Sequence, residues 1–179
     1  MSTRKNNWAV TFAFLTTLLT GCGATNGETD YKKVNSNGLA SKESRGVKAY
    51  QKGNYQRAYD LLVEPAQYGL KGAQYALAFM FLKGQHVEQS TLIGMAWLGV
   101  ATEVKVDEWQ TQYDNLYDSA PTPLKLNIDQ KVAEYIEKFG MKAQDVTCQE
   151  GISEATKHIR TKCFRGTKIT KIYPIELVE

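Results

Sequence analysis

Apolar and small residues recur every three or four positions over residues 44–69, which is the period of an amphipathic helix. The pattern breaks at Gly53-Asn54, so it predicts two short helices that share a turn there. Pro65 has no backbone N–H and predicts a kink or an early end in the second helix, and Gly69 is a candidate cap. The predicted core faces contain Gly46, Ala49 and Tyr50 in the first helix, and Tyr55, Ala58, Leu61 and Leu62 in the second.

The next stretch repeats this plan. A helical stripe runs to a break at Gly84, and a second stripe follows it. Gly53 and Gly84 lie 31 residues apart, and each follows one short helix and precedes another. This spacing predicts an internal repeat, and residues 44–104 are expected to form a short solenoid of helix pairs. The two stripes contain Ala73, Leu77, Met80 and Phe81, and then Ile93, Trp97, Val100 and Ala101.

Residues 105–140 predict a final pair of helices that caps this array. The first covers 106–118 and stops before the segment Ala120-Pro121-Thr122-Pro123. The second covers 124–139, is strongly amphipathic and ends at Gly140. Its predicted apolar face contains Leu124, Ile128, Val132, Tyr135, Ile136 and Phe139.

The C-terminal tail, residues 141–179, has a different pattern. Apolar and polar residues alternate on both sides of Arg165-Gly166, which predicts a small β-hairpin with strands near 158–164 and 167–173. The expected fold class is therefore mainly α. It consists of a short α-solenoid of helix hairpins with a small C-terminal, disulfide-linked β-hairpin or an irregular tail.

The first residues predict a secretory signal. Arg4 and Lys5 precede an apolar run from Trp8 to Leu19, and twelve residues are fewer than the roughly 20 that a membrane span needs. The run ends in Leu19-Thr20-Gly21-Cys22, which resembles the lipobox of bacterial lipoproteins.

This resemblance implies that residues 1–21 are a signal peptide and that Cys22 carries lipid, which anchors the protein to a membrane. Residues 22–43 are polar and are expected to form a flexible tether. Gly23 favours, by analogy, the outer membrane facing the periplasm, with the cell surface as the other place in the envelope.

Chain length, net charge and cysteine number limit the kinds of partner and cross-link to expect. The 158 residues that remain after cleavage make one ordinary domain, and its net charge falls from +3 to +1 without Arg4 and Lys5. A near-neutral chain without basic clusters in its sequence is not expected to bind nucleic acid. With Cys22 assigned to lipid, Cys148 and Cys163 are an even pair in an oxidising compartment, so we expect a disulfide over free or metal-binding thiols.

Residues 73–101 resemble the Sel-one-like repeat, a relative of the tetratricopeptide repeat. Leu77-Ala78-x-x-Phe81 is followed by Gly84-x-x-Val87, and the stretch departs from the family pattern at His86, where a second glycine is expected. The resemblance implies a helix-pair scaffold in which small residues let helices approach and large ones fill the layers. The packing residues that it assigns are Ala73, Leu77, Phe81, Gly84, Gly94, Trp97 and Ala101.

No catalytic or metal-binding motif is found, so we expect no enzyme activity, no cofactor and no metal. The two histidines, His86 and His158, fall in a turn and on a charged segment. The leading hypothesis is a lipid-anchored adaptor or scaffold that binds an envelope protein or peptide. The alternative is a cell-wall ligand binder or enzyme that interacts with peptidoglycan or β-lactams.

Overall fold

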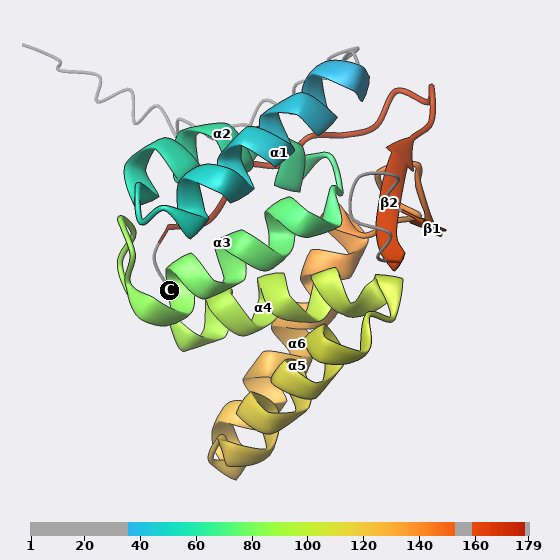
Figure 1. Cartoon of the computed structure of the whole chain (residues 1–179). Helices are drawn as coiled ribbons and strands as arrows, with labels where there is room; N and C mark the ends of the chain where they lie inside the picture. The colour runs from blue at the N-terminus through green and yellow to red at the C-terminus, as the bar shows by residue number, and fades with distance from the viewer. Residues whose placement is uncertain (1–35, 153–158, 178–179) are drawn as a thin grey trace, which may run out of the picture.

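Three helical hairpins stack in layers, and a two-stranded hairpin lies at their edge (Figure 1). The computed structural model describes residues 36–152 and 159–177. Within these residues the protein is mainly helical with one antiparallel β-hairpin, which confirms the predicted fold class. No helix in this part of the chain has the length and apolarity to cross a membrane. The elements are α1 (Ser36–Gln51), α2 (Tyr55–Gln67), α3 (Lys71–Lys83), α4 (Thr91–Ala101), the 3-10 turn η1 (Thr102–Val104), α5 (Asp107–Ser119), α6 (Thr122–Phe139), β1 (Val146–Ile152) and β2 (Ile159–Arg165).

The helices begin and end where local chemistry favours it. The side chain of Asn54 accepts a hydrogen bond from the backbone N–H of Arg57 and caps α2, so the predicted break at Gly53-Asn54 is confirmed. Gly84 ends α3 in the left-handed conformation, and the Ser90 hydroxyl caps α4 by accepting from the N–H of Ile93 at 2.9 Å. These local signals set the length of each hairpin.

The layers are joined by close helix contacts and by a buried aromatic cluster. A Cβ on Gly94 of α4 would lie 2.6 Å from Cγ of Leu82 in α3, so only glycine fits this approach without movement. Trp97 has no exposed surface and packs edge-on against Tyr135 of α6, with ring centroids 4.9 Å apart. Trp97 is therefore part of the core, where it connects the second layer to the third.

The structure corrects the N-terminal boundary. The predicted tether, 22–43, is wrong for residues 36–43, because α1 begins at Ser36. Leu39 is only 1% exposed and joins the hydrophobic core, so tertiary burial stabilises a turn that its polar neighbours do not predict. The predicted signal peptide, Cys22 and the rest of the tether up to residue 35 lie outside the described residues.

The β-hairpin exists, and its predicted strand near 158–164 is confirmed as β2, but the predicted partner strand at 167–173 is wrong. Residues 146–152 form β1 and pair with β2, whereas 167–173 form no strand. Cys148 and Cys163 are direct cross-strand partners with Cα atoms 4.0 Å apart, and the predicted disulfide is confirmed. Burial in this segment does not follow the alternation: Ile169 is 64% exposed, whereas Thr170 is buried and Ile172 and Tyr173 pack against the core.

Residues 166–177, which we call the C-terminal strap, return across the helical body from the hairpin (Figure 1). The carbonyl of Tyr173 accepts a hydrogen bond from the Gln67 side chain of α2 at 2.7 Å. Glu176 forms an ion pair with Lys131 of α6 at 2.6 Å. The strap therefore contacts both the first and the third layer.

Candidate functional site

A cavity of about 350 Å³ lies between the helical body and the inner face of the β-hairpin. We call it the hairpin pocket. On β2, Thr161 and Cys163 line it, while the alternate residues Lys162 and Phe164 are exposed. Figure 1 shows the strands beside the N-terminal end of α3. The helical residues that line the pocket are Glu43 of α1, Lys71 and Gly72 of α3, Val106 before α5, and Trp109 of α5.

Glu43 is the carboxylate of the pocket, and it caps α3 from another helix. Its Oε1 accepts a hydrogen bond from the backbone N–H of Ala73 at 3.0 Å, whereas Leu70, at the cap position of α3 itself, makes no side-chain cap bond. Burial raises the pKa of the Glu43 carboxyl, and the backbone hydrogen bonds from Ala73 and Gly72 oppose this shift. The positive end of α3 therefore holds a carboxylate that burial destabilises.

Lys71 is the cation of the pocket wall, and its side chain is only 1% exposed. Its Nζ donates to Oε1 of Gln74 at 2.9 Å, to the carbonyl of Val100 at 2.9 Å and to Oε2 of Glu103 at 2.6 Å. Burial lowers the pKa of Lys71, and the charge and hydrogen bond of Glu103 oppose this shift. Since an ammonium has three N–H donors and all three are used, Lys71 acts as a structural cation and not as a free amine.

Gln74 extends this buried network to two further helices. Its Nε2 donates to the carbonyls of Ala66 at 3.0 Å and Phe139 at 2.9 Å, and Glu103 Oε2 also accepts from the N–H of Met141 at 2.9 Å. The network therefore links the ends of α2, α4 and α6 through the first turn of α3. It fixes the floor of the hairpin pocket.

Aromatic side chains continue from the pocket across the first helices of the hairpins. Tyr75 of α3 stacks on Trp109 of α5, with ring centroids 4.4 Å apart and planes 17° apart, and it also touches Phe79. The Tyr75 hydroxyl donates to Oε1 of Gln112 at 2.9 Å. Burial raises the pKa of Tyr50 on α1, with Tyr55 and Tyr75 adding to the shift. Four half-buried aromatic residues form this surface, which we call the aromatic face: Tyr50, Tyr75, Phe79 and Trp109.

The residues that the repeat resemblance assigned lie elsewhere. Six of them are buried in α3 and α4, and Gly84 is exposed at the end of α3. None of the seven lines the hairpin pocket. Those buried in α3 and α4 are Ala73, Leu77, Phe81, Gly94, Trp97 and Ala101.

The two histidines do not belong to the pocket either. His86 has a φ of 70°, so this turn position takes the left-handed conformation without a glycine, and its ring packs 5.5 Å from that of Tyr59. His158 lies outside the described residues.

Sequence reasoning missed Glu43, Lys71 and Trp109 as site residues. Glu43 fell in the predicted tether, and Trp109 was not among the candidate site residues. Lys71 did carry a signal, because Lys71 and Gln74 occupy the helical positions that lead into the apolar stripe of Leu77 and Phe81. Polar residues on a core face predict a buried hydrogen-bond network.

The pocket offers the Glu43 carboxylate, the Trp109 ring that stacks on Tyr75, and the disulfide-bonded Cys163. Within residues 36–152 and 159–177, no group of His, Cys, Asp and Glu side chains is arranged to hold a metal ion. Comparisons with protein-family models, with curated proteins and with solved structures find no match for this chain.

Proposed function

We propose that this protein is a lipid-anchored adaptor of the bacterial cell envelope that binds a peptide segment of a partner protein. The binding site is the hairpin pocket together with the aromatic face. The observation that carries the proposal is the continuity of these two surfaces, which meet where Tyr75 stacks on Trp109 at the rim of the pocket. The anchor rests on the lipobox-like segment that ends at Cys22.

The chemistry of the site suits a peptide. Half-exposed aromatic rings provide contact area at a small cost in side-chain entropy, and they are enriched in protein interfaces. A cavity of about 350 Å³ has the size to accept a bulky apolar or amphipathic side chain. Arrays of helical hairpins bind partners along the extended surface of their stacked units, and α1, α3 and α5 all contribute to this site.

The charged groups of the pocket favour binding over acid–base catalysis. Lys71 has its three donors engaged, and Glu43 accepts hydrogen bonds from the start of α3. A general base or nucleophile needs a group that is free to exchange a proton or attack a substrate. Both groups instead hold the helices that form the pocket.

The experiment is photo-crosslinking in living cells, followed by mass spectrometry. A photo-reactive amino acid replaces Val106, which lines the pocket, and the control replaces Leu126, which is 61% exposed on α6. We expect the probe at position 106 to capture a defined protein that the probe at position 126 does not. Identical captures at both positions, or capture of peptidoglycan in place of protein, would contradict the proposal.

A substitution then tests the contribution of the aromatic face. Trp109→Ala should weaken binding of the captured partner by about tenfold or more, because buried aromatic anchors dominate interface energies. Leu126→Ala should leave binding unchanged. Retention of affinity in Trp109→Ala would remove the aromatic face from the binding site.

A further inference from the structure

A second cavity, of about 240 Å³, lies at the turn between α1 and α2 and is surrounded by cations. Arg45 and Lys48 come from α1, and Lys52 comes from the turn that follows it, at intervals of three and four residues that keep the three on one side. Arg57 comes from the first turn of α2. Ala49 and Asn54 complete the lining, which contains no carboxylate. We call this cavity the basic pocket.

None of these four cations is neutralised by a carboxylate in the described residues. Among the residues that the structure describes, ion pairs are formed by Lys42, Lys71, Lys131, Lys138 and Lys168, and by none of the four in the basic pocket. The guanidinium Nε of Arg45 makes a long hydrogen bond, 3.4 Å, to the carbonyl of Ser41. Clustered cations without carboxylates repel one another, so an anion in this pocket would be stabilised.

The helix dipoles explain only part of the cluster. Lys48 lies in the last turn of α1, where the negative end of the dipole favours a cation. Arg57 lies in the first turn of α2, where the dipole has the opposite sign and disfavours a cation. Local helix electrostatics therefore do not account for Arg57 beside three other positive charges.

We propose that the basic pocket binds phosphate headgroups of anionic phospholipids at the membrane surface. The proposal rests on the lipid anchor in the proposed function, since Ser36 comes only 14 positions after Cys22. Such a length of chain spans at most about 50 Å, so the anchor would hold α1 close to the headgroups. This proximity raises the effective concentration of lipid at a site that alone binds weakly.

The position of the pocket makes the two surfaces compatible. The turn between α1 and α2 lies at the end of the helical layers opposite the β-hairpin (Figure 1). Headgroups bound at the basic pocket would therefore leave the hairpin pocket directed away from the bilayer. A partner could reach the aromatic face while the protein remains on the membrane.

The test measures vesicle binding by the full chain that carries Cys22→Ser, so the proposed lipid makes no contribution. Vesicles of phosphatidylcholine are compared with vesicles that also contain phosphatidylglycerol. We expect a preference for phosphatidylglycerol that weakens with added salt. In the Arg45→Gln/Lys48→Gln/Lys52→Gln variant, affinity for these vesicles should fall about a hundredfold, since each cation at an anionic surface contributes about fivefold.

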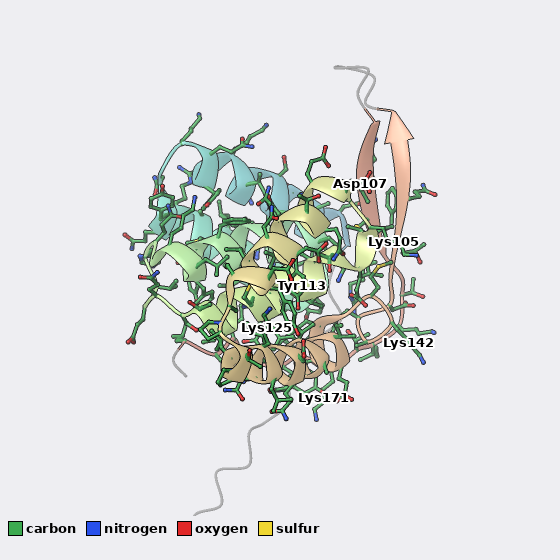
Figure 2. All side chains as sticks on the ribbon, turned by 90° about the horizontal axis from the view of Figure 1, so that it is seen from below. Lys105, Asp107, Tyr113, Lys125, Lys142 and Lys171 are labelled. Atoms are coloured by element: carbon green, nitrogen blue, oxygen red, sulfur yellow. A yellow bond between two sulfur atoms is a disulfide. The ribbon has the colours of Figure 1, made fainter. Side chains whose placement is uncertain are left out.

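The matched control removes the same number of charges elsewhere. Lys105, Lys142 and Lys171 are exposed, and Figure 2 shows them on the side of the helical body away from the turn between α1 and α2. Their triple replacement by glutamine should cost less than tenfold, while Lys48→Arg/Lys52→Arg should bind like the parent chain. Circular dichroism checks that each variant is folded; Arg57→Gln alone provides a milder test if the triple variant is not.

Three outcomes would overturn the proposal. The parent chain could show no preference for phosphatidylglycerol, or the two triple glutamine variants could lose affinity equally. Alternatively, inorganic phosphate could shift the amide signals of the basic pocket while the vesicles do not bind, which would indicate a site for soluble anions. Because the chain tested lacks Cys22, each of these results is separate from failure of the lipid anchor or of partner binding.

Discussion

Lys71 Nζ lies 2.6 Å from Oε2 of Glu103, and this ion pair joins the first turn of α3 to the 3-10 turn that follows α4. The Lys71 side chain is almost fully buried, and the Glu103 side chain is 23% exposed. A charge buried to this degree persists only when its partners satisfy it. The pair therefore holds the two ends of the second hairpin together through a buried electrostatic contact.

Removal of one partner should be strongly destabilising. Glu103→Ala leaves the Lys71 ammonium buried without its carboxylate, and we expect a loss of about 3–5 kcal/mol in the free energy of unfolding. The double variant Lys71→Met/Glu103→Ala should lose less than the sum of the single changes, because it removes the uncompensated charge. Urea unfolding followed by circular dichroism measures these values. Lys131→Met, which breaks a more exposed pair, is the control and should cost less than about 1 kcal/mol.

Glu43 and Glu134 should give pH dependences of opposite sign. Burial raises the pKa of Glu43 in the folded protein above 4.5, so the native state binds its proton more tightly than the unfolded state does. Stability should therefore fall as the pH rises from the unfolded pKa through the folded one. Glu43→Gln should remove this loss, so the variant becomes more stable relative to the parent chain as the pH is raised toward neutrality.

Glu134 provides the contrast on α6. The hydrogen bond from Lys138 lowers the pKa of Glu134, with Lys131 adding to the shift, so its contribution is present above the unfolded pKa. That contribution is lost as the pH falls through the folded pKa, and Glu134→Gln should remove it. Unfolding measured at a series of pH values separates the two variants. Parallel curves for both would contradict the assigned burial of Glu43.

Loss of the disulfide should loosen the β-hairpin and leave the helices intact. Cys148→Ser/Cys163→Ser removes a cross-link that closes a loop of 15 residues. In the chain-entropy model such a link lowers the entropy of the unfolded chain and so stabilises the folded protein by about 3 kcal/mol. We expect faster amide exchange in β1 and β2 with little change in the helical circular dichroism signal. Melting of the helices in this variant would show that the hairpin supports the whole fold.

Two glycine-to-alanine changes should act in opposite directions. A Cβ on Gly94 would lie 2.6 Å from Cγ of Leu82 and 3.0 Å from the carbonyl oxygen of Ala78, so Gly94→Ala must displace the Leu82 side chain or move α4 away from α3. We expect a cost of about 1–3 kcal/mol from this overpacking. A Cβ on Gly38 of α1 would meet no atom within 4 Å, so Gly38→Ala should stabilise the helix by up to about 1 kcal/mol. Thermal unfolding of the two variants compares them directly.

The helix hairpins could be predicted because their signals are local. The side chains of Asn54 and Ser90 cap helices by accepting a hydrogen bond from a backbone N–H only three residues further along the chain. Gly84 ends α3 through its own left-handed backbone conformation. The start of α1 could not be predicted in this way. Leu39 is buried by distant residues, while Gly38 and Ala40 beside it are exposed and carry no helical pattern.

The hairpin pocket could not be predicted because four segments that are distant in the sequence build it. Glu43 contacts the start of α3 across 30 residues, and β2 reaches the pocket only through its pairing with β1. In residues 146–152 the alternation of Val146 and Cys148 is interrupted by Glu150 and Gly151, so the sequence gives only a weak strand signal. The disulfide was predictable from the parity of the cysteines, but the strand register that brings Cys148 opposite Cys163 was not.

The C-terminal strap changes how this stack of hairpins should come apart. In an open solenoid each unit touches only its neighbours, so terminal units can fray one at a time. Here Tyr173 of the strap binds the first layer and Glu176 binds the third, so the strap connects the two terminal hairpins directly. Neither end can detach without breaking the strap, so the three hairpins should unfold as one cooperative unit. Because these contacts join residues far apart in sequence, that unit should also fold more slowly than an open array of the same size.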